Sequence, residues 1–254
     1  MFWRRIKVSQ RAGVTQLVEC DLAKVDVAGS NPVSRSIIWP AMTKPLAGIL
    51  LFSSLLVPVH AQDYKLAASP MSGPPAGLPA AYTAVLGPGM RIDGPDGADK
   101  VEIWFCKTIT AGPAPSDPAI VFGIAQGTLL GVIRWPGKGE DRRGQTISPG
   151  LYTLRYSDFP VDGAHQGVAP QRDFALMTPI GNDPDPAAKP AFDALVQAST
   201  KASNSPHPAV LSLEPSSATA FPSLSKEGDT PDWVLNVQVG TLKLGIILIG
   251  KFQG

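Results

Sequence analysis

The feature that most constrains the fold is a series of short β-type segments separated by glycine and proline. Beyond residue 88, apolar and β-branched residues gather in short runs that end at Gly or Pro, as in "GTLLGVIRWPGKG". Runs of this length with turn residues at the breaks are typical of antiparallel sheets. They predict a mainly β protein in which about nine strands form an antiparallel β-sandwich over residues 89–254.

Two hairpins are predicted from their turns. In "GMRIDGPDGADKVEIWFCKT" the tetrapeptide at residues 94–97 supplies the turn. In "DWVLNVQVGTLKLGIILIG" the chain should turn at Gly240-Thr241, with the face that carries Leu235 pointing inward. The second strand of this hairpin is apolar on both faces, so we expect it to lie centrally in the sheet. Gly245 should then mark a bulge or a close backbone approach.

Other segments fill in the rest of the chain. Strands are expected at "AIVFGI" (residues 119–124) and "GTLLGVIRW", followed by a charged glycine-rich loop, "PGKGEDRRG". One α-helix is expected at about residues 190–203, where Phe192, Leu195 and Val196 follow helical spacing and Pro190 suits a first turn. We expect this helix to pack on the sheet.

The start of the chain carries the pattern of a secretory signal peptide. From Met42 the sequence "MTKPLAGILLFSSLLVPVHAQD" has a short basic region at Lys44, an apolar stretch and small residues before Gln62. We therefore expect residues 42–61 to be removed on export to the periplasm or the medium. Residues 62–88, rich in Pro, Ala and Gly, are expected to form an extended or loosely packed arm.

The stretch "VAGSNPVSRS" has neither strand nor helix periodicity. Its residues 29–32 can be encoded by GGTTCGAATCCC, which contains the T-arm sequence of a bacterial tRNA. Residues 15–19 and 20–26 similarly allow a D-arm and an anticodon stem. Residues 12–36 thus resemble a mistranslated glycine tRNA gene, which implies that residues 1–41 are a spurious extension. The alternative is a disordered N-terminal extension whose codons match by chance.

Charge and cysteine content exclude some functions for the chain that follows residue 61. It holds 15 Lys and Arg against 18 Asp and Glu, and it has no basic stripe, which argues against nucleic-acid binding. Cys106 is its one cysteine, so an internal disulfide is excluded. We expect Cys106 to be a buried strand residue, although a reactive thiol is an alternative. We expect no transmembrane anchor in the exported form.

The segment with the most chemically versatile side chains is "RYSDFPVDGAHQGVAPQRDF". In it His165 could act as a base oriented by Asp162, with Arg172 nearby, which would suit a hydrolase-like or ligand-processing site. The candidates for ligand binding are Tyr156, Asp158, Gln166 and Asp173. In the alternative interpretation, Asp162 begins a turn, His165 caps the loop, and Arg172 pairs with Asp173.

Metal and cofactor sites are not predicted. His165 and His207 are far apart, and no H-x-x-x-H or C-x-x-C spacing is present. "GNDPDP" offers oxygen ligands but lacks the rest of a calcium loop, and "GPGMRIDG" precedes a strand where a dinucleotide fingerprint needs a helix. The tryptophans at 104, 135 and 233 are expected in the core or at sheet edges. The alternative for them is a platform that stacks on sugars.

Two motifs, "PGLYTLRY" and "DGAHQGVAPQRDF", resemble those of uncharacterised exported β-sandwich proteins of bacteria. That resemblance implies a sandwich fold and export, and it brings no activity with it. The sequence therefore favours an exported, non-catalytic binding or structural module over an enzyme. Its partner would be a small molecule, a glycan or a protein of the cell envelope.

Overall fold

The computed structural model describes residues 63–159, 171–228 and 230–251, all within one compact unit, Val57–Gly254. The strands of its large sheet are β1 (Lys65–Leu66), β2 (Leu86–Asp93), β3 (Asp99–Cys106), β4 (Leu129–Trp135), β7 (Gly150–Asp158), β8 (Asp173–Pro179), β9 (Val210–Pro215), β10 (Ser223–Lys226), β11 (Trp233–Val239) and β12 (Leu242–Ile249). A small second sheet pairs β5 (Gly139–Glu140) with β6 (Thr146–Ile147). The helices are α1 (Ala80–Val85), α2 (Phe192–Ser203) and a 3₁₀ turn, η1 (Ile180–Asn182).

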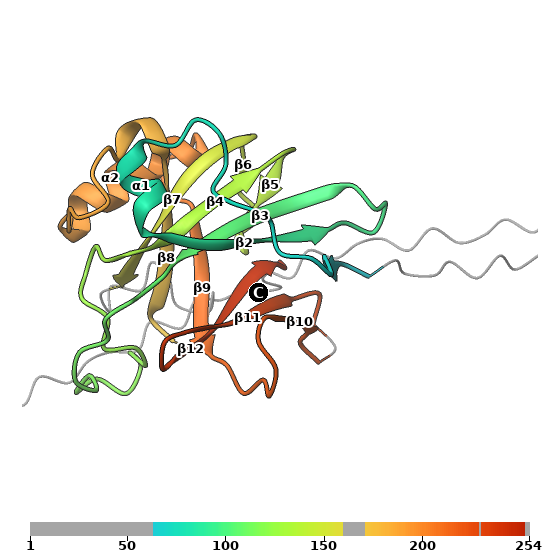
Figure 1. Ribbon diagram of the computed structural model, residues 1–254. Helices are drawn as coiled ribbons and strands as arrows, with labels where there is room; N and C mark the ends of the chain where they lie inside the picture. The colour runs from blue at the N-terminus through green and yellow to red at the C-terminus, as the bar shows by residue number, and fades with distance from the viewer. Residues whose placement is uncertain (1–62, 160–170, 229, 252–254) are drawn as a thin grey trace, which may run out of the picture. The chain divides into compact units, whose positions relative to one another are not determined.

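The described part of the chain is mainly β and its strands pair antiparallel, as predicted (Figure 1). The arrangement differs from the predicted sandwich, because ten strands form one continuous sheet in the order β1-β2-β3-β4-β7-β8-β9-β12-β11-β10. The physical reason lies in β9. Its residues 210–212 pair with β8 and its residues 213–215 pair with β12. A strand that changes partner along its length turns a corner and joins what would otherwise be two sheets.

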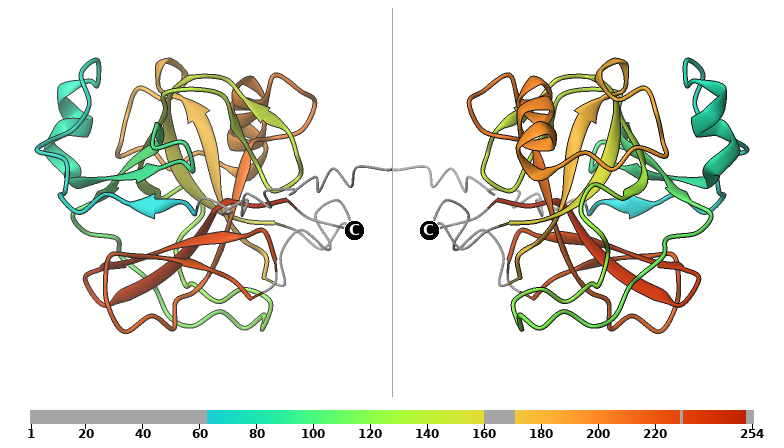
Figure 2. Two further views of the ribbon diagram at one scale, coloured as in Figure 1. Left: turned by 90° about the vertical axis from the view of Figure 1, so that its right-hand side faces the viewer. Right: turned by 90° about the vertical axis from the view of Figure 1, so that its left-hand side faces the viewer.

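The continuous sheet curls until its two ends meet, so it resembles a nearly closed barrel. β1 contacts β10, and the rings of Tyr64 and Trp233 pack edge to face with their centroids 5.6 Å apart. In both views of Figure 2, the red strands β11 and β12 lie below the green and yellow strands and run at an angle to them. We call this junction between the first and last strands the seam.

The seam is incomplete because both edge strands are short. β1 pairs only with Ile92 and Asp93 of β2, and β10 pairs with β11 only as far as Asn236. The outer edge of β11 at residues 237–239 therefore has no strand partner within the described part of the chain.

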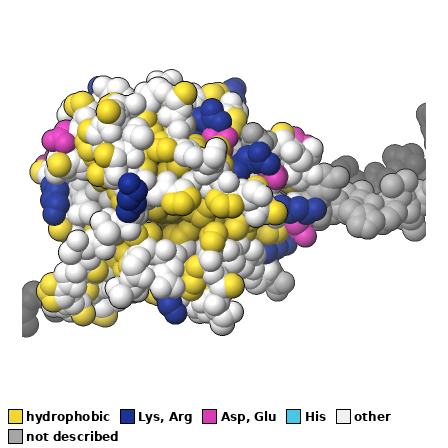
Figure 3. Space-filling view, viewed as in Figure 1, with side chains coloured by type: hydrophobic (Ala, Val, Ile, Leu, Met, Phe, Trp, Pro, Cys, Tyr) yellow, Lys and Arg dark blue, Asp and Glu magenta, His cyan; other side chains and the backbone are white. Residues whose placement is uncertain are grey.

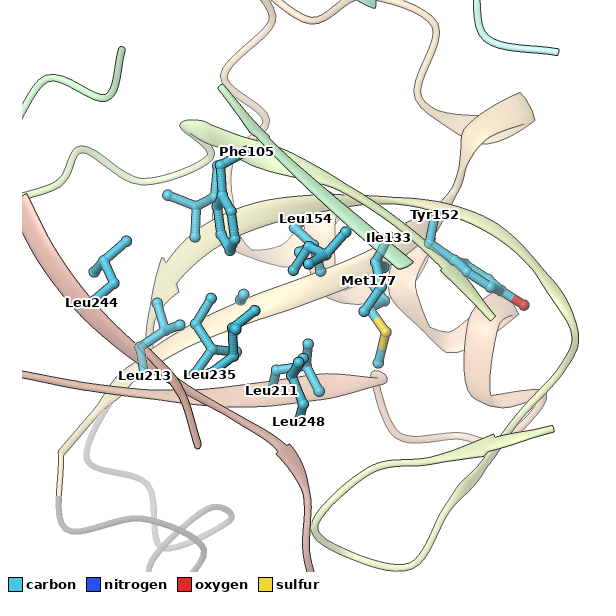
Figure 4. Close-up of a cluster of buried hydrophobic side chains, with 14 of the residues drawn as sticks. Phe105, Ile133, Tyr152, Leu154, Met177, Leu211, Leu213, Leu235, Leu244 and Leu248 are labelled. Carbon is cyan, nitrogen blue, oxygen red and sulfur yellow. The ribbon is translucent and has the colours of Figure 1, made fainter. Parts of the chain in front are cut away.

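Large apolar side chains fill the interior of the curled sheet (Figure 4). Phe105 and Leu154 come from one side of the sheet, and Leu213, Leu235 and Leu244 come from β9, β11 and β12 on the other. Leu154, Leu213, Leu235 and Leu244 are completely buried. Burial of this kind is the main stabilising term for a domain that has no disulfide among its described residues.

The predicted C-terminal hairpin is confirmed. β11 and β12 pair with Val239 opposite Leu242, so the chain turns at Gly240-Thr241, where Gly240 has a φ of +61°. Leu235 faces the core, and β12 is central because it pairs with β9 and β11. A Cβ on Gly245 would lie 2.9 Å from the Glu214 side chain, so the glycine makes room for a side chain; the predicted bulge or backbone approach is not found there, since Gly245 pairs in register with Asn236.

The predicted helix is also confirmed, as α2. Its Leu195 is 1% exposed and packs with Phe174, Leu176 and Val210 on the outer face of β8 and β9. The helix ends at Asn204, whose left-handed conformation (φ 48°) stops the helical run.

Two segments differ from expectation. The arm at residues 62–88 holds β1 and α1 in its described part, and Tyr82 of α1 is completely buried. Residues 119–124 form no strand; Ile124 makes only an isolated bridge to Ala111. The backbone N–H groups of residues 121 and 122 donate instead to the Asp173 carboxylate, so they are not available to a strand partner.

Candidate functional site

The predicted loop site falls partly outside the described residues, where Asp162, His165 and Gln166 lie. Of the remaining candidates, Tyr156 and Asp173 are brought together. The Tyr156 hydroxyl donates to Asp173 Oδ1 at 2.7 Å, and both residues are buried. Burial and the neighbouring Asp173 carboxylate raise the pKa of Tyr156, so this hydroxyl remains a hydrogen-bond donor.

Asp173 and Arg172 anchor the connection between β3 and β4. The Asp173 carboxylate accepts the N–H groups of Val121 at 2.8 Å and Phe122 at 3.1 Å. Arg172 pairs with Asp117 at 2.6 Å. Asp158 lies opposite Asp173 in the β7–β8 register. Tyr156, Arg172 and Asp173 therefore make internal contacts that hold a loop against the sheet.

A second buried polar cluster centres on Arg155, which has no exposed surface. Its five N–H groups are all used. Two hydrogen bonds go to the Asp183 carboxylate at 2.6 and 2.8 Å. The other three go to the backbone carbonyls of Gly127, Asp185 and Ala188. A guanidinium with every donor satisfied has none left for a ligand, so the cluster is structural.

An apolar groove of about 770 Å³ lies at the seam. Its walls are residues 66–70, 87–90, 105–107, 221–222 and 237–240, and we call it the seam groove. Figure 3 shows the corresponding band of hydrophobic side chains across this face, between β2 above and β10 and β11 below. Phe105, Val237 and Val239 belong to the core and also line the groove. The groove is thus a place where the core is open to the surface.

A neighbouring cavity of about 530 Å³ is lined by residues 84–85, 106–108, 128–129 and 186–189, so it shares Cys106 and Lys107 with the seam groove. Among the described residues that line the two cavities, the charged ones are Lys107 and Lys189. Lys107 is exposed, and its ammonium donates to the Ala84 carbonyl at 2.8 Å, which leaves two of its three protons available.

Cys106 lies between the two cavities. Its thiol donates a hydrogen bond to the Leu129 carbonyl, with Sγ 3.5 Å from the oxygen, and burial raises the pKa of the thiol to about 11. Such a thiol is protonated at neutral pH and is a poor nucleophile. The prediction of a buried strand cysteine is confirmed, since Cys106 ends β3 and is 8% exposed.

Sequence reasoning missed the groove. Wall residues such as Val237 and Val239 alternate along their strand in the same way as fully enclosed core residues. The sequence pattern therefore does not show that this side of the core is open to the surface. The short length of β1 and β10 creates the opening, and neither strand is long enough to give a periodic signal.

Within the described ranges, no group of His, Cys, Asp and Glu side chains is arranged to hold a metal ion. No helix there has both the length and the apolar character needed to cross a membrane. Comparison of the chain with protein-family models, with curated proteins and with solved structures found no match.

Proposed function

We propose that the protein is an exported, non-catalytic binding module whose ligand is an anionic amphiphile held in the seam groove. The observation that carries the proposal is an apolar groove of ligand size that opens into the core and has a lysine at its rim. Pockets of about 300–1,000 Å³ that combine apolar walls with a few polar groups are typical of small-molecule sites.

The apolar part of the ligand would lie against Phe105, Val237 and Val239. These side chains are 5, 3 and 7% exposed, respectively, so this part of the groove wall is set by the packed core. A chain of methylene groups gains about 0.8 kcal/mol for each CH₂ that leaves water. The groove therefore favours a flexible hydrocarbon chain.

The charges that line the two cavities favour a ligand with an anionic head group. Asp and Glu are absent from the described linings of the groove and its neighbour, while Lys107 stands where the two cavities meet. An ammonium without a nearby carboxylate attracts an anion and disfavours a cation. A carboxylate or phosphate head at Lys107 could place its apolar chain in the groove.

Export is part of the proposal. It rests on the leader pattern at residues 42–61. Amino-terminal sequencing of the protein purified from its native host should give a chain that begins at Gln62. A chain that retains Met42 would refute export while leaving the binding proposal intact.

The binding test uses isothermal titration calorimetry of the full chain with three twelve-carbon probes, namely dodecanoate, dodecanol and dodecyltrimethylammonium, below their micellar concentrations. We expect dodecanoate to bind most tightly. Lys107→Ala should weaken dodecanoate binding by about three- to tenfold while leaving dodecanol unchanged. The matched control is Lys138→Ala, since Lys138 is also exposed but does not line the groove.

The apolar wall is tested separately. Phe221→Ala removes a partly buried ring from the groove and should weaken both dodecanoate and dodecanol. Phe192→Ala removes a partly buried ring from α2, remote from the groove lining, and should change neither. If no probe binds, or if Phe221→Ala and Phe192→Ala behave alike, the amphiphile proposal is wrong.

A further inference from the structure

A different cavity lies at the seam and has a different chemistry. It measures about 400 Å³ and is lined by aromatic rings together with charged side chains of both signs. Its walls come from both ends of the curled sheet, because Tyr64 precedes β1 and Trp233 begins β11. The seam groove shares none of its lining residues.

Three aromatic rings line this cavity. Tyr64 and Trp233 are partly exposed and are held edge to face, with an angle of 66° between their planes. Trp135 is 1% exposed and is wedged against Gly139, where a Cβ would lie 2.6 Å from the ring. The rings are thus fixed in the free protein, and a ligand that binds them does not have to order them first.

The rim of the cavity offers both donors and acceptors. Lys100, Lys226 and Lys251 supply ammonium groups, and Asp63 and Glu140 supply carboxylates; Lys100 is half-buried and the other four are exposed. Lys251 and Glu140 form an ion pair that is long at 3.8 Å, and both side chains are more than half exposed. Exposed pairs of this kind contribute little, so both groups are available to a ligand.

We infer that this cavity binds a sugar ring of a neutral glycan. The C–H faces of a sugar ring pack on aromatic rings, while its hydroxyl groups each donate and accept hydrogen bonds. A hydroxyl can therefore use an ammonium and a carboxylate at the same rim, as Lys226 and Glu140 provide. A purely apolar ligand would leave these charges unpaired, whereas uncharged hydroxyl groups can use both the three ammonium groups and the two carboxylates of the lining.

The inference is independent of the amphiphile proposal, because the two cavities have separate linings. Neutral sugars should bind at Trp233 whether or not dodecanoate binds at Phe221. The two proposals can therefore fail separately.

The test is a titration of the full chain with three neutral hexasaccharides that differ in linkage or in ring substituent, namely cellohexaose, maltohexaose and N-acetylchitohexaose, and with a galacturonate hexamer. Calorimetry gives the affinity, and tryptophan fluorescence reports on the cavity through Trp135 and Trp233. We expect at least one neutral hexamer to bind and to change the fluorescence. Trp233→Ala should weaken this binding by about tenfold or more.

Because Trp233 also closes the seam through Tyr64, a second variant avoids that packing. Lys226→Ala changes an exposed rim residue and should weaken the neutral glycan about threefold or more, whereas Lys201→Ala, on the last turn of α2, should have no effect. Phe221→Ala, in the other groove, should leave glycan affinity unchanged. The inference is overturned if no neutral hexamer binds, if the galacturonate hexamer binds more tightly, or if Lys226→Ala and Lys201→Ala bind equally well.

Discussion

Arg155 and Asp183 form a buried two-pronged ion pair, with Nε 2.6 Å and Nη2 2.8 Å from the two carboxylate oxygens. The same carboxylate accepts the Thr153 hydroxyl at 2.6 Å, and the Asp183 carbonyl accepts the Tyr82 hydroxyl at 2.7 Å. One cluster thus ties together β7, the segment after η1 and helix α1. It fixes part of the arm to the sheet.

Removing either charge of this pair should be strongly destabilising. Arg155→Met leaves the Asp183 carboxylate buried without its partner, and breaking a buried pair costs about 3–5 kcal/mol. Urea unfolding should show this loss. The control is Lys251→Ala, which breaks the long exposed pair with Glu140 and should change the free energy of unfolding by less than about 1 kcal/mol. Equal effects of the two substitutions would contradict the structural role given to Arg155.

Gly89 should not tolerate a methyl group. A Cβ at this position would lie 2.2 Å from Nε1 of Trp104, whose ring is completely buried and donates to the Gly73 carbonyl at 2.8 Å. The ring cannot move away cheaply, so Gly89→Ala should cost about 1–3 kcal/mol. Gly181→Ala is the matched control, because a Cβ there meets no atom within 4 Å. Thermal unfolding of both variants decides the matter, and equal melting temperatures would show that the Trp104 ring adapts.

The Cys106 thiol should react slowly with alkylating reagents in the folded protein. Burial raises its pKa from 9.0 to about 11, so at pH 8 its thiolate fraction is about a hundredfold below that of an unperturbed thiol. In a Cys20→Ser background, the rate with iodoacetamide should rise about tenfold per pH unit until pH reaches about 11. The unfolded chain loses this proton first, so the group lowers stability as pH rises from 9 to 11. The urea-unfolded chain is the reference, and there the alkylation rate should level off near pH 9. If the rate also levels off near pH 9 in the folded protein, burial does not raise the pKa of Cys106.

The central position of β12 makes its inward side chains costly to truncate. Leu244 is completely buried in the core between β9 and β11, and Leu244→Ala should cost about 2–5 kcal/mol. Val85→Ala, on the exposed side of α1 at 38% exposure, should cost less than about 1 kcal/mol. Chemical unfolding of both variants gives the comparison. A small loss for Leu244→Ala would mean that the strand is peripheral to the stable core.

The sequence predicted the parts of the fold that are specified locally. The β11–β12 hairpin has a two-residue turn and clear alternation, and α2 has an apolar stripe, so both could be placed from short-range pattern. Closure of the sheet could not be predicted from short-range pattern, because it depends on β9 changing partners between residues 212 and 213. The apolar run at residues 119–124 has the composition of a strand, but Asp173, about 50 residues later, takes its N–H groups.

For the candidate sites too, the sequence predicted what is specified locally and missed what depends on residues far apart in the chain. Polar residues concentrated in one segment pointed to Tyr156 and Asp173, and the two do meet, but in a buried contact that holds a loop. The tryptophans at 135 and 233 were expected in the core or at sheet edges; Trp135 is buried at the end of β4, and Trp233 begins β11. Whether they share a cavity depended on Tyr64 arriving from the other end of the chain. Residues that are adjacent only through closure leave no trace in local sequence pattern.

The junction of Tyr64 with Trp233 also sets an order of events during synthesis. Strands β2 to β8 can pair in turn as the chain emerges in order from its amino-terminal end, because each lies beside the next large-sheet strand in the chain. Tyr64 must wait for a partner about 170 residues later. Until the last hairpin arrives, a growing chain presents its unfinished apolar interior to whatever surrounds it, so chains that stop short of residue 233 should be the ones that associate with chaperones or aggregate.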